Sequence, residues 1–213
     1  MSAPLRAGSA LALLCCACLG AGCSGLLHSS APPVQTYFLR PPLPAAGAAA
    51  VPAMAAALRV EQPLASPGLD SAHIMLMQSD HRMNFYAASR WPGTAPELIG
   101  ALAVQTLRAA GAFSSVQDAA GAFPADYLLQ ITLRRFDADY SGGGAAPEVH
   151  VALDCSIGRR EGREPIASFT AQGTATAGAD RMSEVVAAFE QATGAALQSL
   201  SQQAGEAVRV HSP

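Results

Sequence analysis

The stretch from residue 127 to residue 176 constrains the fold most, because apolar and polar side chains alternate along it in three long runs. Alternation at every second residue is the pattern of a β-strand that buries one face. Turn residues separate the runs, first the glycines at 142–144 and then Glu161-Gly162. The apolar positions of the middle run are Val149, Val151, Leu153, Cys155 and Ile157. The pattern predicts an antiparallel meander of three strands.

The first of these runs changes phase partway along. Its apolar side chains lie at odd positions up to Leu133 and at even positions from Phe136 onward. An extra residue in one strand absorbs such a shift, so we expect a β-bulge near residues 134–135. Asp137 and Asp139 then share one side of the strand, where paired carboxylates can serve in acid–base chemistry. Because no sign of a cleft accompanies them, we predict that both are solvent-facing charges.

Two segments have the period of an amphipathic helix. Thr94 and Glu97 form a capping box, and the apolar residues after them recur at helical spacing until Gly111 ends the run. A second helix begins after Asp180, its predicted N-cap, and leaves 205–213 as a frayed tail. Together with the strands, these helices predict an α+β fold class. We expect a two-layer sandwich whose mainly antiparallel sheet carries the two amphipathic helices on one face.

Shorter strands are predicted on both sides of the first helix. They cover residues 34–39, 58–61, 74–77, 83–86 and 113–116, and the third and fourth form a hairpin around a polar turn. Residues 41–57 are rich in proline, alanine and glycine, which predicts a surface loop. The folded domain is therefore expected to span residues 34–204, with this loop inserted in it.

The first 23 residues resemble the signal of a bacterial lipoprotein. Arg6 is followed by a short apolar run and then by small residues that end at Cys23. The run is shorter than the roughly 20 residues that cross a bilayer. In lipoproteins the chain is cut before the cysteine, which is acylated, with palmitate among its chains. Residues 1–22 are thus predicted to be a signal peptide, Cys23 the lipidation site, and 23–33 a flexible tether. An ordinary cleaved signal and a cytosolic apolar N-terminus are the alternatives.

Charge and residue usage exclude several functions. Without residues 1–22 the chain has 12 arginines against 16 acidic residues, and this net charge of −4 does not suit nucleic acid. Lysine is absent, which excludes a Walker A phosphate loop and Schiff-base chemistry. Cys155 is the only cysteine after Cys23, so no disulfide can form within the domain. Packing alone must stabilise the fold in an oxidising compartment.

No candidate catalytic or metal site stands out in the sequence. The five histidines are scattered, and no Gly-x-Ser-x-Gly motif occurs. His150 and Cys155 are candidates for a nucleophilic pair, but the alternation places Cys155 among core residues, where a thiol is inert. His150 and Asp154 lie too far apart along a strand to share a metal ion, at about 3.3 Å per residue. We therefore predict no enzyme, no cofactor and no metal.

Residues 84–91 concentrate aromatic and arginine side chains. Phe85, Tyr86, Arg90 and Trp91 belong to residue types that are enriched in protein interfaces, so we predict that they bind a partner. The alternative is that Phe85 packs in the core and Trp91 covers the first helix.

Several short motifs occur in a recognisable order. They are Tyr37-Phe38-Leu39, Leu64-Ala65-Ser66-Pro67-Gly68-Leu69-Asp70-Ser71, Asn84-Phe85-Tyr86, Arg90-Trp91, Pro96-Glu97-Leu98, Ala125-Asp126-Tyr127-Leu128-Leu129 and Val186-Ala187-Ala188-Phe189. From about Tyr37 to Ala204 the chain resembles, in these motifs, the ABC-type transport auxiliary lipoprotein family. Members of this PqiC-like group accompany MCE-type lipid transporters. The chain departs from the family pattern in its Ala/Pro-rich insert at 44–56.

The resemblance implies a non-enzymatic lipoprotein of the outer membrane that faces the periplasm. Ser24 favours this location, because an aspartate after the lipidated cysteine tends to retain lipoproteins at the inner membrane. The implied partners are an MCE-domain protein, an ABC permease and its ATPase, which move lipids or other hydrophobic molecules between the two membranes. Two alternatives remain: an assembly factor or plug for an outer-membrane β-barrel, and a periplasmic hydrolase with an unrecognised site.

Overall fold

The computed structural model describes residues 33–44 and 53–211. The compact unit of the chain begins at Val34. The predicted signal peptide, Cys23 and most of the Ala/Pro-rich loop lie outside the described residues. Within the described residues a nine-stranded sheet and two α-helices confirm the predicted α+β class. No helix in this part of the chain is long and apolar enough to cross a membrane.

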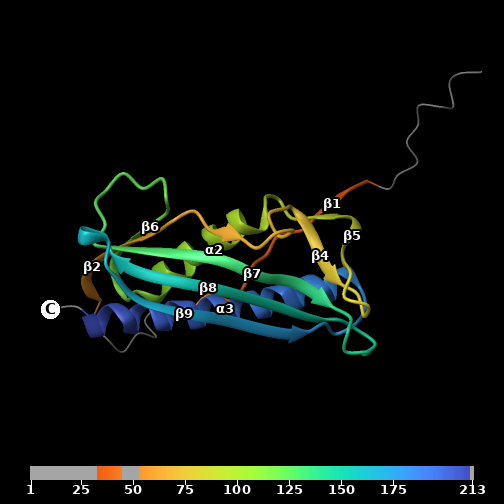
Figure 1. The fold of residues 1–213 in the computed structure, drawn as a ribbon. Helices are drawn as coiled ribbons and strands as arrows, with labels where there is room; N and C mark the ends of the chain where they lie inside the picture. The colour runs from red at the N-terminus through yellow and green to blue at the C-terminus, as the bar shows by residue number, and fades with distance from the viewer. Residues whose placement is uncertain (1–32, 45–52, 212–213) are drawn as a thin grey trace, which may run out of the picture. The chain divides into compact units, whose positions relative to one another are not determined.

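The central strand of the sheet is β7 (Tyr127–Asp139). β8 (Glu148–Arg159) pairs antiparallel along β7, and β9 (Pro165–Thr176) pairs antiparallel with β8. These three strands are the long arrows in Figure 1, and they confirm the predicted meander. The register of β7 against β8 shifts between Leu133 and Arg135, which confirms the predicted bulge.

Three short strands pair one after another along the other side of β7. They are β2 (Met54–Val60), β3 (Leu64–Ala65) and β4 (His73–Met77), and all three run parallel to β7. Antiparallel pairing is confined to the meander and to the hairpin of β4 with β5 (Met83–Arg90), as predicted for that hairpin. The sheet is therefore mixed, because the chain from β2 to β4 follows β7 in the same direction.

β2 corrects the predicted loop at 41–57, since the strand begins at Met54. Its first half consists largely of alanine, which has a weak preference for strands. The strand is nevertheless paired on both sides, with β6 (Phe113–Gln117) and with β7. These ladder hydrogen bonds and the burial of Ala56 and Leu58 outweigh the local preference.

The N-terminal strand is shorter than the predicted 34–39. β1 consists of Gln35–Thr36, which pairs parallel with β5. Beyond β1 the chain turns onto the second helix, where the backbone N–H of Arg40 donates to Glu190 Oε1 at 2.8 Å. Pro42 lies so close to Gly194 that a Cβ there would meet the proline ring at 2.9 Å. We call residues 37–42 the strap, because they cross this helix and are held to it.

The first helix, α2 (Ala95–Ala110), begins and ends where predicted. The backbone N–H of Thr94 donates to the Glu97 carboxylate at 2.9 Å, as a capping box requires. Gly111 adopts the left-handed conformation, with φ of 67°, and its N–H donates to the carbonyl of Arg108. The capping-box reading of the sequence is confirmed.

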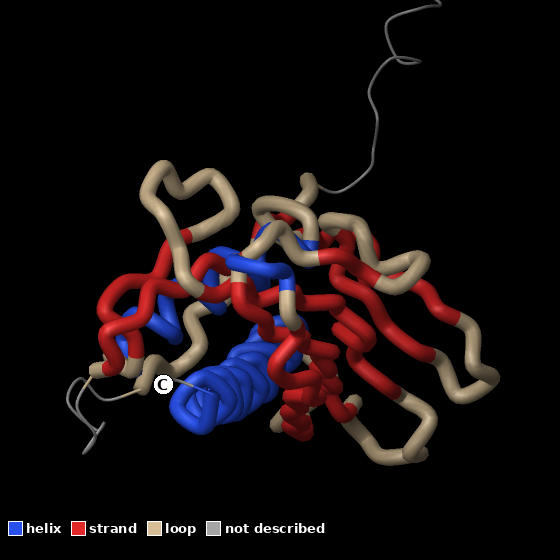
Figure 2. The backbone as a smooth tube through the Cα atoms, turned by 60° about the vertical axis from the view of Figure 1, so that its left-hand side comes forward, coloured by secondary structure: helices blue, strands red, loops and turns tan. Residues whose placement is uncertain are grey.

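The second helix, α3 (Met182–His211), corrects two predictions. It continues through the predicted frayed tail, because Val208 is fully buried and Arg159 donates to the carbonyl of His211. Asp180 does not cap it; the carboxylate accepts a hydrogen bond from Tyr140 Oη at 2.7 Å instead. The long helix seen in Figure 2 packs against β8 and β9, and α2 packs against α3 and β6.

The contact between α3 and β9 depends on one glycine. A Cβ built at Gly173 would overlap the carbonyl oxygen of Ala192 and would lie 2.9 Å from the backbone N of Ala196. The helix therefore approaches the strand with backbone against backbone at this point. This approach lets the small and apolar side chains of α3 reach the core under the sheet.

Candidate functional site

The predicted partner-binding residues lie on β5, where the backbone is irregular. Met75 pairs with Phe85 and His73 pairs with Arg90, so β5 uses more residues than β4 over the same distance. Within this irregular part of β5, Ala88 has a φ of 53°, a left-handed conformation that is uncommon for a residue with a side chain. This bulge changes which side chains face the core before and after it.

Phe85 lies on the exposed side of the bulge. Its side chain is 47% exposed, and its ring stacks on that of His73 with 4.3 Å between the centroids. His73 Nδ1 in turn forms a 2.8 Å hydrogen bond with Ser71 Oγ. The stack holds the aromatic ring of Phe85 in one orientation while one of its faces stays accessible. Phe85 therefore does not pack in the core, in contrast to the alternative interpretation of the sequence.

Tyr86 is half-buried, and its hydroxyl is already engaged. Tyr86 Oη and Tyr140 Oη are 2.8 Å apart, and Tyr140 Oη donates to Asp180. Burial and the hydrogen bond with Tyr140 raise the pKa of Tyr86 well above its ordinary value. Burial and the hydrogen bond to Asp180 also raise the pKa of Tyr140. This chain of three side chains ties β5 to the end of β7 and to the turn before α3.

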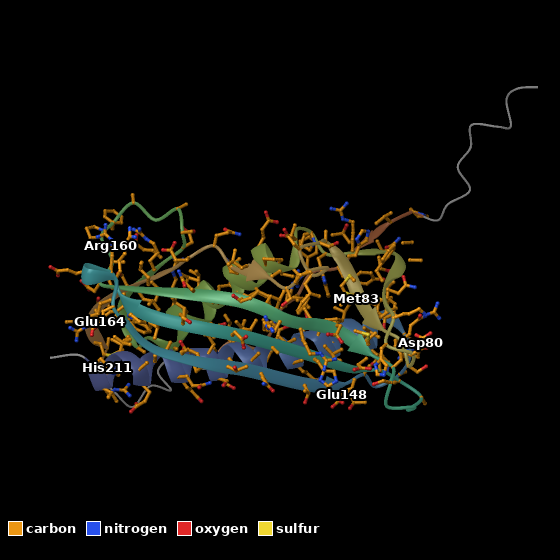
Figure 3. All side chains as sticks on the ribbon, viewed as in Figure 1. Asp80, Met83, Glu148, Arg160, Glu164 and His211 are labelled. Carbon is orange, nitrogen blue, oxygen red and sulfur yellow. The ribbon has the colours of Figure 1, made fainter. Side chains whose placement is uncertain are left out.

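Arg90 is exposed, and its charge has no acidic partner in the described part of the chain. Its Nε donates to the carbonyl of Trp91 at 3.3 Å, which orients the guanidinium group without neutralising it. Arg82, at the tip of the same hairpin, is instead paired with Asp80 at 2.6 Å. The tip with Asp80 and Met83 is labelled in Figure 3. Of these two arginines, Arg90 is the one available to a partner.

Trp91 is not an interface residue, which corrects the prediction. Its side chain is fully buried, and its ring packs on Phe136 and Phe189 with centroid distances of 5.7 and 5.3 Å. Phe136 and Phe189 also contact each other at 5.0 Å. Because of the bulge at Ala88, Trp91 faces the core while Phe85 faces solvent. No residue type in the sequence predicts this bulge.

A second correction concerns Asp137 and Asp139, which are not solvent-facing charges. The side chain of Asp137 is 3% exposed, and Arg135 pairs with it at 2.8 Å. The same guanidinium group pairs with Asp139 at 3.0 Å. Arg135 follows the β-bulge and lies over both carboxylates, so one arginine neutralises and covers the pair. The carboxylate oxygens of both residues already accept hydrogen bonds, so the cluster has a structural role.

The pKa of Asp139 predicts a dependence of stability on pH. Burial raises this pKa, but hydrogen bonds from Ser141 and Arg135 outweigh burial and lower it below its ordinary value of 3.8. A carboxyl group with a lowered folded pKa stabilises the fold above the unfolded pKa and loses that effect as the pH falls through the folded pKa. We expect Asp139→Asn to lower the free energy of unfolding by about 1–2 kcal/mol at pH 7.

Urea unfolding between pH 2 and pH 7 checks this prediction. The difference between Asp139→Asn and the unmodified chain should be constant well above the ordinary carboxyl pKa and should shrink as the pH falls below it. Asp70→Asn, at an exposed carboxylate, is the control and should change stability little at any pH. An equal loss for Asp139→Asn at pH 2 and pH 7 would contradict the assignment.

The residues considered for catalysis are not brought together. Cys155 is 2% exposed, and burial raises the pKa of its thiol to about 12, which confirms it as a core cysteine. His150 lies 3.4 Å from Glu148 on the face of β8 opposite to Cys155. Within the described residues, no three His, Cys, Asp or Glu side chains are placed to hold a metal ion.

Comparison with known proteins gives a family and a fold. The sequence model of the ABC-type transport auxiliary lipoprotein component matches residues 37–203. Protein XCC0632 from Xanthomonas campestris is 23% identical, with 84% of this chain and 98% of that chain covered at a TM-score of 0.75. An uncharacterized protein of known structure is 15% identical, with coverage of 83% and 99% and a TM-score of 0.61. At these identities the two structures show a shared fold. No curated protein sequence matches the chain.

Proposed function

Since the chain belongs to the family of ABC-type transport auxiliary lipoprotein components, we propose that it is the lipid-anchored auxiliary component of an MCE-type ABC transporter. The family match over residues 37–203, almost the whole compact unit, carries this proposal. According to this proposal, the transporter moves lipids or other hydrophobic molecules between the inner and outer membranes. An MCE-domain protein, a permease and an ATPase are its partners.

The proposal places the chain at the outer membrane on the periplasmic side. Cys23 is the lipidated residue, and Ser24 after it does not act as a retention signal for the inner membrane. Several acyl chains on one cysteine hold a protein almost permanently, since each buried CH₂ contributes about 0.8 kcal/mol. The residues between Cys23 and Val34 then connect the anchor to the compact unit.

The proposed role is non-enzymatic. The nucleophile candidate Cys155 is buried, with a high pKa, and points away from His150. Asp137 and Asp139 are both paired with Arg135. The candidates for catalysis are therefore either buried or already paired. This supports a binding role without catalysis.

We propose Phe85 and Arg90 as the surface that docks to the MCE partner. Both are exposed on one strand, and each is held in orientation by a neighbour, His73 for Phe85 and the Trp91 carbonyl for Arg90. Pre-oriented aromatic and arginine side chains lose little entropy on binding and dominate interface energies. We propose Tyr86, which is half-buried and bonded to Tyr140, as a further contact of this surface.

Affinity purification of the full-length protein from its own membranes in mild detergent tests the function. Mass spectrometry should identify an MCE-domain protein with its permease and ATPase among the co-purifying proteins. Recovery of an outer-membrane β-barrel without them would overturn the proposal in favour of an assembly factor or plug.

The same purification tests the docking surface. We expect Phe85→Ala with Arg90→Ala to lower recovery of the MCE partner about tenfold or more, because both proposed anchors are removed. The matched control is Arg209→Ala with Val210→Ala, two exposed residues at the C-terminal end of α3. Undiminished recovery with a folded Phe85/Arg90 variant would place the partner elsewhere on the domain.

A further inference from the structure

The loop between β6 and β7 is held by hydrogen bonds from the strands beside it. The guanidinium group of Arg59 donates to the carbonyls of Gly121 and Phe123, at 3.0 and 2.6 Å. The N–H of Phe123 donates to Gln117 Oε1 at 3.1 Å. Arg59 on the neighbouring strand β2 thus holds the backbone of the loop. The loop does not depend on burial of the Phe123 side chain for its conformation.

This fixed loop presents an aromatic ring to solvent. The side chain of Phe123 is 74% exposed, more than any other large apolar side chain among the described residues. A mobile loop would fold such a ring against the protein surface, whereas this loop holds it outward. Exposed apolar side chains on rigid supports are a recurring property of interaction sites.

Three arginines lie beside the loop. Residues 124–128 and the end of β8 line a cleft of about 740 Å³ together with Arg159, Arg160 and Arg163. The N–H of Arg160 donates to the carbonyl of Asp126 at 2.9 Å, which joins this turn to the base of the loop. Figure 3 labels Arg160 close to the loop.

The charge of this cleft is unbalanced. Arg159 donates to the C-terminal carbonyl of α3, but Arg160 and Arg163 have no ion pair within the described chain. Asp126 and Glu161 are the acidic residues of the lining, and the Asp126 carboxylate already accepts from the N–H of Ala57 at 2.7 Å. Three positive charges against two negative ones stand out in a chain whose net charge is −3.

The turn that carries these arginines is strained. The short helix η1 (Glu161–Arg163) contains Gly162 with a φ of 72°, and Arg163 follows with a φ of 52°. A left-handed arginine costs of order 1 kcal/mol, and such conformations persist where the surrounding structure or function requires them. Here the two left-handed residues lie in the turn from β8 into β9, and Arg163 belongs to the lining of the cleft.

The loop and the start of β1 lie on the same side of the compact unit. Both are at the upper side in Figure 1, with the loop toward the left end of the unit and β1 toward the right end. If Cys23 is acylated, the membrane surface lies within the reach of the eleven residues 23–33. That reach is at most about 40 Å. A tether of that length leaves the domain free to turn the loop with Phe123 toward the membrane that would hold the proposed anchor.

We propose that Phe123, Arg160 and Arg163 bind the surface of an anionic lipid bilayer, as a second contact beside the lipid anchor. The phenyl ring enters the boundary between headgroups and acyl chains, and the two guanidinium groups pair with lipid phosphates. The contact fixes the orientation of the domain on the membrane, which a flexible tether alone does not. This inference rests on the lipidation of Cys23 in the proposed function but not on any transporter partner.

A fluorescent label tests the contact in the lipidated full-length protein. Ala122→Cys creates a reactive thiol beside Phe123 and leaves the phenyl ring in place, because Ala122 is exposed, Cys155 is buried and Cys23 carries the acyl chains. The protein is labelled with a polarity-sensitive dye and reconstituted into phosphatidylglycerol vesicles that contain spin-labelled lipid. The same label on Gln198→Cys, at an exposed position of α3, is the matched control. Mass spectrometry of the preparation records the acyl chains, so a missing anchor is recognised separately.

We expect the lipid quencher to lower the emission at position 122 by about twofold or more and to leave position 198 unchanged. Arg160→Gln and Arg163→Gln should each lower the fraction of docked protein about fivefold, and high salt should act in the same direction. The control pair Arg181→Gln and Arg209→Gln should have no effect, since both arginines are already paired with glutamates. A label at position 122 that the lipid does not quench, or whose emission changes only after an MCE-domain protein is added, overturns the proposal. Equal quenching in phosphatidylcholine vesicles removes the role assigned to the arginines and overturns it as well.

Discussion

Replacing Trp91 by alanine should lower the free energy of unfolding by about 3–5 kcal/mol, the range for large aromatic residues lost from a core. Trp91 is completely buried and contacts two other rings, Phe136 from β7 and Phe189 from α3. The substitution leaves a cavity where the sheet and the long helix meet, and neither element can move in without breaking its other contacts. Against a typical stability of about 5–15 kcal/mol, this is a large fraction.

Urea unfolding followed by circular dichroism checks the prediction. The midpoint should fall strongly while the slope with urea stays constant, because the change acts on the native core. Phe85→Ala is the control, since it removes an aromatic ring from the strand just before Trp91, at a position that is 47% exposed. We expect it to lower stability by about 1 kcal/mol or less. Similar losses for the two variants would contradict the assignment of Trp91 to the core and Phe85 to the surface.

Gly173→Ala should have the second large effect, a loss of about 3 kcal/mol at the upper end of the range for overpacked cores. The added methyl group would overlap the carbonyl oxygen of Ala192, and it would lie 2.9 Å from the carbonyl carbon of the same residue. These are backbone atoms in the middle of a 30-residue helix, so they cannot move aside as a flexible side chain would. Either α3 must shift away from β9 or the strand must bend.

Thermal unfolding of Gly173→Ala beside Gly142→Ala isolates this steric effect. A Cβ at Gly142 meets nothing within 4 Å, and the residue does not have a left-handed backbone. Gly142→Ala should therefore be neutral or slightly stabilising, because alanine restricts the unfolded chain more than glycine does. If Gly173→Ala matched it, the helix would not approach the strand as closely as the structure has it.

Local patterns in the sequence were sufficient for several parts of the fold. Alternation predicted the meander, the change of phase at Leu133 and Phe136 predicted the bulge, and the Thr94–Glu97 box predicted the start of α2. In each case the residues that determine the structure are close to one another in the chain. The long-range pairing of β2, β3 and β4 along β7 was not predictable, since no local pattern specifies a partner some 60–70 residues away.

Local patterns predicted even less of the candidate site, where side-chain orientation depends on strand pairing. Sequence reasoning grouped Phe85 and Trp91 because residues 84–91 concentrate aromatic and arginine side chains. Ala88, a residue with no preference for the left-handed region, separates them, and only the pairing of β5 with β4 imposes that conformation. Asp137 was misjudged for a related reason, because the bulge places Arg135 over it. A bulge can be predicted from a phase change in apolar residues, but the salt bridges it creates cannot.

The way the N-terminal chain enters the fold also determines how the domain bears mechanical load. A pull on the proposed lipid anchor would reach β1 first, and β1 is joined to β5 through two residue pairs. Behind it the strap resists more strongly, since Leu39 is buried and Arg40 is bonded to Glu190 on α3. Detaching residues 34–36 releases about 10 Å of chain and leaves every core contact intact. In the proposed complex, release of β1 would let the domain follow small changes in the distance between the membrane and its partner, up to the point where the strap holds the chain.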